Sequence, residues 1–188
     1  MDGNEIFTYN NNSLGFTWLD FWKFQYSNID NLKESIAEFL VAKALGIDTP
    51  HNTSYWTLFD ILYRNTRIEV KQTAYYHPWN ENGNVSNARI FDIKKANSSY
   101  ENEKSPNIYE RQNDIYVFCL NNGNTKETSN PLELSNWEFY IIPTSVINEQ
   151  CQNNKTVSLG RIRSMGFSHF EFGQIKAEID RIIDELHK

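Results

Sequence analysis

Two runs rich in β-branched and aromatic residues, separated by two polar residues, constrain the fold of this 188-residue chain most. The runs cover residues 56–63 and 66–70, and Arg64-Asn65 stands between them. Branched and aromatic side chains favour strands, and Asn tolerates the left-handed backbone of a tight turn. The pattern therefore predicts a β-hairpin with a two-residue turn.

The expected register of this hairpin brings charged side chains together. With a two-residue turn, Asp60 lies opposite Glu69, and cross-strand partners have Cβ atoms about 5 Å apart on one face. Side chains alternate between faces along a strand, so Glu69 and Lys71 share a face. Two carboxylates this close repel each other unless a cation lies between them, and oxygen ligands favour Mg²⁺ or Mn²⁺. The hairpin therefore predicts a metal site.

A helix expected over residues 31–46, ended by Gly46, precedes the hairpin. Glu38 lies on a face that it shares with Val41 and Leu45, and a carboxylate among apolar side chains needs a partner. Glu38 is therefore the predicted third acid of the site, with Glu34 in reserve. The opposite apolar stripe is expected to contain Leu32, Ile36, Phe39 and Leu40.

The set Asp60, Glu69-Val70-Lys71 resembles the signature of the PD-(D/E)xK nuclease superfamily, with Phe59 where its proline would stand. Most of the chain, from residue 20 to 144, looks like a group of little-characterised bacterial proteins with this nuclease fold. The resemblance implies an α/β, restriction-endonuclease-like sandwich, in which a central mixed β-sheet is flanked by α-helices. We expect residues 1–188 to form a single domain.

The resemblance also implies that the protein is a Mg²⁺-dependent nuclease. The expected activity is that of a DNA endonuclease. Asp60 and Glu69, with the backbone carbonyl of Val70, would hold Mg²⁺, and Mn²⁺ would substitute for it. Glu38 would act through a metal-bound water. Lys71 would orient or help to deprotonate the attacking water and contact the scissile phosphate.

Residues near the motif are candidates for contacts with nucleic acid. Aromatic side chains can stack on bases, and arginines can contact phosphates. In an ideal strand Gln72 points away from Lys71, so its involvement requires the strand to end or twist. The expected substrate-binding residues are Gln72, Tyr75, Trp79, Arg64 and Arg67.

Other interpretations of the motif remain open at this stage. A Glu-x-Lys sequence in a solvent-facing strand is often only a polar face. The alternative function is a nuclease-fold protein that binds nucleic acid or a protein partner without cutting, with its carboxylates retained as scaffold. A metal titration distinguishes the two, because only a working site should lose metal binding in Asp60→Ala.

Composition limits the class of protein. Eighteen basic against 24 acidic residues give a net charge of -6, which excludes a broad basic surface, so any nucleic-acid contacts are local. A chain that is 39% hydrophobic is not disordered. No apolar run approaches the ~20 residues of a membrane span. We expect a cytoplasmic protein without membrane contact. The sequence leaves open whether it forms a homodimer.

The remaining pattern predicts further elements of the sandwich. Residues 89–93 have the composition of a third strand, and residues 114–120 and 137–142 that of central strands. Cys119 lies in one of these apolar runs and is expected to be a small core residue. A C-terminal amphipathic helix is expected from Ile175, Ile179, Ile182, Ile183 and Leu186.

Overall fold

The structure is a computed structural model that describes residues 2–9, 12–25, 33–48, 59–76, 89–97, 109–125 and 128–187. Its contacts divide the chain into two compact units, Met1–Lys33 and Glu34–Lys188. None of the helices in the described part of the chain has the length and apolar character needed to cross a bilayer.

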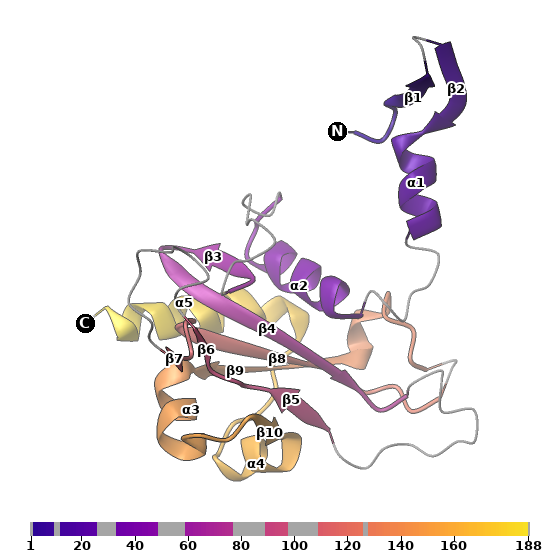
Figure 1. Cartoon of the computed structure of the whole chain (residues 1–188). Coiled ribbons are helices and arrows are strands. Elements are labelled where there is room, and N and C mark those ends of the chain that lie inside the picture. The colour runs from indigo at the N-terminus through magenta and orange to yellow at the C-terminus, as the bar shows by residue number, and fades with distance from the viewer. Residues whose placement is uncertain are drawn as a thin grey trace. The chain divides into compact units, whose positions relative to one another are not determined.

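A four-stranded mixed sheet forms the centre of the second unit (Figure 1). Its strand order is β3-β4-β8-β9, in which β4 and β8 are parallel and the other two pairs are antiparallel. Every residue of β8 is buried, as its continuous apolar run predicts for a strand covered on both faces. The strands are β3 (Ile61–Tyr63), β4 (Thr66–Ala74), β8 (Ile115–Asn121) and β9 (Trp137–Pro143).

Helices cover both faces of this sheet (Figure 1). α2 (Lys33–Ala44) and α5 (Ile175–Leu186) share one apolar core with Ile68, Val70 and Cys119. α3 (Thr144–Cys151) and α4 (Leu159–Ser164) share a second core with the opposite faces of β8 and β9. The prediction of an α/β protein with a central mixed sheet flanked by helices is therefore confirmed, and the buried Cys119 is a core residue as expected.

The strand expected over residues 89–93 forms outside the central sheet. β5 (Ile90–Asp92) pairs antiparallel with β10 (Thr156–Ser158), and this two-stranded sheet contributes Phe91 and Val157 to the second core. The described part of the second unit also contains β6 (Ala96–Asn97) paired with β7 (Tyr109–Glu110), and the 3₁₀ turns η3 (Leu134–Asn136) and η4 (Phe172–Gln174). The first unit contains β1 (Ile6–Tyr9), β2 (Asn12–Thr17) and α1 (Trp18–Gln25).

The β3–β4 hairpin forms in the predicted register. Tyr63 pairs with Thr66 and Ile61 with Ile68, so Arg64 and Asn65 are the two turn residues. Their φ angles are 47° and 61°, and positive φ at both central positions is what the type I′ turn of a two-residue hairpin requires. The local sequence therefore determines this part of the fold.

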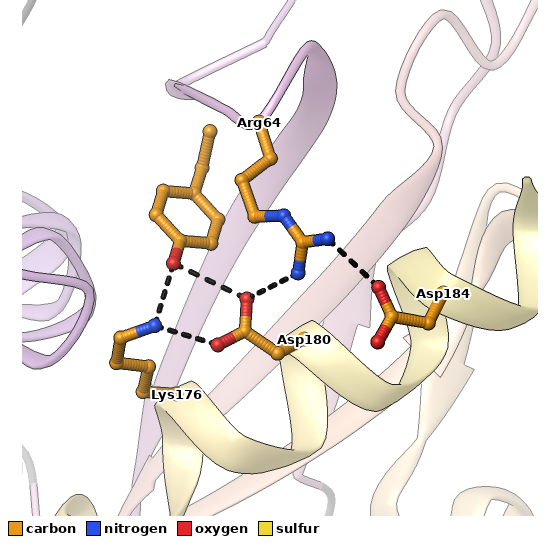
Figure 2. Close-up of polar contacts among 5 residues, drawn as sticks. Arg64, Lys176, Asp180 and Asp184 are labelled. Atoms are coloured by element: carbon orange, nitrogen blue, oxygen red, sulfur yellow. Dashed lines mark hydrogen bonds and ion pairs between the residues drawn. The ribbon is translucent and has the colours of Figure 1, made fainter.

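The tip of the hairpin is tied to α5 by a set of polar contacts (Figure 2). Arg64 donates to Asp180 at 2.8 Å and to Asp184 at 2.7 Å. Lys176 donates to the second oxygen of Asp180 at 2.6 Å and to the Tyr63 hydroxyl at 2.7 Å. Arg64, predicted to contact nucleic acid, thus has two carboxylate partners within the chain.

The buried stripe of α2 differs from the predicted one. Ala37, Leu40, Val41 and Leu45 face the core. The prediction that Phe39 belongs to the apolar stripe is wrong, since its side chain is 58% exposed. The reason is tertiary, because the sheet contacts the helix along the line of Ala37 and Val41, and Phe39 lies to the side of that line.

The contacts of Arg64 generate a test of its role. We expect Arg64→Ala to lower the urea midpoint of unfolding slightly, by less at 0.5 M than at 0.05 M NaCl, because exposed ion pairs are screened by salt. Chemical denaturation at both salt concentrations measures the effect. Unchanged stability together with weaker nucleic-acid binding would instead support the predicted role of Arg64 in contacting nucleic acid.

Candidate active site

Asp60 lies immediately before β3 and leaves the regular ladder there. Its backbone N–H donates to the Ile68 carbonyl at 3.0 Å, and its side-chain Oδ2 accepts from the backbone N–H of Val70 at 2.7 Å. β3 begins only at Ile61, so a side chain instead of a strand residue satisfies the Val70 N–H. The expected cross-strand pairing of Asp60 with Glu69 is thus replaced by a carboxylate held against the edge of β4.

The backbone carbonyl of Val70 emerges at the same edge of β4. In an extended strand the N–H and C=O of one residue point to the same neighbour. Because the Val70 N–H points to Asp60, its carbonyl is directed to the side of the strand where the Asp60 carboxylate lies. The Asp60 carboxylate and the Val70 carbonyl are therefore both oxygen donors on this side of β4.

Glu69 and Lys71 share the opposite face from Val70, as predicted. They align with Tyr116 and Phe118 on β8, which belong to the second core. Lys71 Nζ lies 2.6 Å from Glu69 Oε1, and the two side chains are only 25% and 18% exposed. The amine and the carboxylate are therefore preorganised next to each other.

The pKa of Glu69 reflects the electrostatic character of the site. Burial raises its pKa to about 7, and the negative charges of Asp60 and Glu38 act in the same direction, whereas Lys71 lowers it. Charges shift a pKa this way only when they lie close by in a poorly solvated place. Asp60, Glu38 and Lys71 thus all act on the Glu69 carboxyl.

Glu38 approaches from α2, on the other face of the sheet from Glu69. It is half-buried, and with Asp60 it lines a cavity of about 160 Å³ whose other walls come from α2, from Ile47 and Asp48 after it, and from β3. Burial and, to a lesser extent, the charges of Asp60 and Glu38 raise the pKa of the Cys119 thiol, which lies in the core that α2 covers. The side chain of Glu34, the reserve candidate, lies outside the described residues.

The donor set suits a hard divalent cation. Within the described ranges, no three His, Cys, Asp or Glu side chains are grouped so that they could share a metal ion. Mg²⁺ does not need such a group, since it keeps several waters and is commonly held by one or two carboxylates together with substrate phosphates. Asp60, Glu69 and the Val70 carbonyl are oxygen donors of that kind, and a cation would offset the charges of Asp60 and Glu38 that, after burial, raise the pKa of Glu69.

The predicted substrate-binding residues lie in different surroundings. Arg67 pairs with Asp114 through its backbone N–H and its guanidinium. Gln72 of β4 aligns with Cys119 of β8, so β4 does not end there and the Gln72 side chain points away from Lys71. The Arg89 guanidinium covers the Tyr75 ring at 3.3 Å. Trp79 lies outside the described residues.

Two residues near the site were missed by the sequence analysis. Tyr116 is buried beside Glu69, and burial together with the Glu69 charge raises the pKa of its phenol. Asp92 on β5 is close enough to Lys71 for the ammonium to contribute to lowering the pKa of its carboxyl, although its hydrogen bonds to Lys94 contribute more. No local signal could have identified them, because both positions depend on how β5 and β8 meet β4.

No protein-family model and no curated protein sequence matches the chain. A functional assignment therefore depends on the residues of the site and their geometry.

The raised pKa of Glu69 predicts that the stability of the metal-free protein falls as pH rises. An acid whose pKa is higher in the folded state than in the unfolded chain binds its proton more tightly when folded. Stability from this group is therefore full below pH 4.5 and is lost as pH rises to about 7, by at most about 3 kcal/mol. The Glu69→Gln variant carries no ionisable group at this position and should not lose this stability. The difference in unfolding free energy between the variant and the wild type should therefore grow as pH rises from 4.5 to about 7.

Urea unfolding in EDTA between pH 4.5 and 8 measures this difference. Glu149→Gln, which removes an exposed carboxylate from α3, is the control. Parallel pH profiles for the wild type and Glu69→Gln would show that Glu69 ionises normally in the folded protein.

The hydrogen bond to the Val70 N–H gives Asp60 a structural role as well. Asp60→Ala should destabilise the metal-free protein by about 1–3 kcal/mol, because it leaves that N–H without an acceptor. Asp60→Asn should lose much less, since its amide oxygen can accept the same bond while the repulsion with Glu69 disappears. Thermal or urea unfolding compares them, and equal losses would mean that the carboxylate charge itself holds the fold.

Proposed function

We propose that the protein is a metal-dependent phosphodiester hydrolase, a nuclease of the PD-(D/E)xK type acting on DNA. The observation that carries this proposal is the pairing of Lys71 Nζ with Glu69 Oε1 at 2.6 Å, in a site where burial and the charges of Asp60 and Glu38 raise the pKa of the Glu69 carboxyl to about 7. Strongly perturbed acids beside a specific partner are typical of functional sites. The hairpin register and the α/β sandwich support the same assignment.

Asp60, Glu69 and the carbonyl of Val70 are the groups that would hold the cation. When bound, Mg²⁺ or Mn²⁺ neutralises charge that develops on the phosphate and acidifies a bound water. The hydrogen bond from the Val70 N–H fixes the orientation of the Asp60 carboxylate in advance. Such preorganisation is what a catalytic constellation needs, since little rearrangement remains to be made at the moment of reaction.

Lys71 supplies the positive charge of the protein itself. Its ammonium, anchored 2.6 Å from Glu69, would donate to a non-bridging oxygen of the scissile phosphate and orient the attacking water. Glu38 would enter from α2 as the third acidic group, on the side of the sheet where it lines the cavity with Asp60. Lys71 with Glu69, and Glu38 with Asp60, would thus approach the substrate from opposite sides of the β4 edge.

The internal contacts of the site also favour a second candidate, a nuclease-fold protein that binds without cutting. Asp60 has a backbone partner and Glu69 has an ammonium partner, so these residues could be retained as scaffold. Isothermal titration with Mg²⁺ and Mn²⁺ separates the candidates. The nuclease requires binding that is weakened in Asp60→Asn, whereas a scaffold site would bind no metal.

Cleavage assays test the proposal directly. Plasmid, linear and single-stranded DNA and RNA are incubated with the protein in Mg²⁺, in Mn²⁺ and in EDTA. We expect metal-dependent cleavage of DNA that disappears in Asp60→Asn and Glu69→Gln and persists in Glu149→Gln. Absence of cleavage on all four substrates in both metals would refute the activity.

Lys71 should matter for the chemical step more than for metal binding. Lys71→Ala is expected to lower kcat by about 10²-fold or more, with little change in metal affinity, because the ammonium acts mainly in the transition state. Lys71→Arg should rescue poorly, since a guanidinium is larger and forked. Single-turnover kinetics with calorimetry measures both effects, and native-rate cleavage by Lys71→Ala would remove Lys71 from the mechanism.

A further inference from the structure

The cavity of about 160 Å³ between α2 and β3 adjoins the candidate active site, because Glu38 and Asp60 form part of its wall. The residues that line it belong to the second unit. Phe39, Ala42 and Ile61 contribute apolar surface to the wall. The catalytic roles proposed above involve only the two acids and do not account for the apolar part of the cavity.

The size of the cavity limits what it can hold. An apolar protein cavity of about 150 Å³ holds one benzene molecule, so 160 Å³ is enough for one six-membered ring. The Phe39 ring lies at the wall and is not covered by the core, so that a flat ligand can stack on it. Aromatic and apolar walls of this kind hold nucleobases that have left the base stack. A pyrimidine, which is a single ring, therefore fits better than a purine, which has two fused rings.

The charges around the cavity disfavour an anion inside it. Glu38 and Asp60 are both acidic, and Lys43, a basic residue of the wall, pairs with Asp48 at 2.9 Å. A phosphate group in the cavity would be repelled by the two acids. A pyrimidine base is uncharged, and a carboxylate can accept a hydrogen bond from the amine of a base such as cytosine. The cavity is therefore suited to the base of a nucleotide and not to its phosphate.

The position of Asp60 links the cavity to a nucleic-acid ligand. In the proposed nuclease Asp60 holds the cation that binds the scissile phosphate, and the same residue lines the cavity. A nucleotide whose phosphate is bound at that cation has its base close to the cavity. An apolar side chain of a protein partner would also suit the space, but it has no phosphate that would bring it to the cation.

We propose that the cavity lined by Phe39, Ala42 and Ile61 binds one pyrimidine base of a DNA strand, at the nucleotide next to the scissile phosphate. The base stacks on Phe39 and is unpaired when it is bound, so it comes from a single strand or from an extruded nucleotide. The inference rests on the proposed function, since it takes the site to bind nucleic acid.

The affinity for single-stranded oligonucleotides tests this proposal without cleavage. Fluorescence anisotropy in Ca²⁺ measures the Kd of short labelled strands of thymidine, of deoxyadenosine and of an abasic analogue, and gel electrophoresis confirms that they stay intact. The wild type should bind the thymidine strand about tenfold more tightly than the abasic strand, as a stacked base contributes that much. It should also bind the thymidine strand more tightly than the deoxyadenosine strand.

Variants of the cavity wall should remove this preference. Phe39→Ala deletes the stacking surface, and Ala42→Phe fills the cavity with a ring of the chain itself, so both should bind the thymidine and abasic strands alike. Tyr109→Ala deletes an exposed aromatic side chain outside the cavity and should keep the preference. Circular dichroism checks that each variant folds. If Ala42→Phe does not fold, Phe39→Ala, at an exposed position, decides the question.

The outcomes separate this proposal from the nuclease assignment. A wild type that binds no strand, or binds the three strands equally, overturns the base site, as does a pyrimidine preference that a folded Phe39→Ala variant keeps. Metal-dependent cleavage alongside such a result refutes the base site alone. A pyrimidine preference that Phe39→Ala loses, without cleavage in Mg²⁺ or Mn²⁺, supports the base site and refutes the nuclease alone.

Discussion

The arrangement of the candidate site depends on one hydrogen bond, from the backbone N–H of Val70 to the side chain of Asp60. β3 has only three residues, so the longer β4 continues beyond its partner. An uncovered strand edge would leave a buried N–H unsatisfied, which is costly. The Asp60 carboxylate satisfies it, and the same bond directs a negative charge towards the strand segment that carries Glu69 and Lys71.

The site lies beside β8, a strand of the sheet that has no room for charge. β8 is buried along its whole length, and both of its faces contact apolar cores. β4 lies next to it, yet only its apolar residues Ile68 and Val70 enter a core, while Glu69 and Lys71 remain partly accessible. Glu69 is therefore near enough to the core to lose solvation, yet its side chain remains partly accessible.

Much of this architecture could be predicted from local sequence, and the exceptions share a cause. The two-residue turn follows from the two strand-forming runs and from Asn65, which tolerates positive φ, and the apolar run 114–120 marked a central strand. The departure of Asp60 from the ladder could not be predicted, because it depends on where β3 stops. Distant contacts decide the other differences too, including the pairing of Arg67 with Asp114 and the exposure of Phe39.

The parallel pairing of β4 with β8 has a consequence for the order in which the chain folds. These strands are neighbours in the sheet, yet the chain between them runs from Ala74 to Ile115, so their contact requires closing a long loop. The β3–β4 hairpin needs no such closure and can form in microseconds. The hairpin that bears Asp60, Glu69 and Lys71 can therefore exist as a local unit before the sheet is complete. The repulsion between its two carboxylates becomes severe only when β8 and the helices remove the surrounding water.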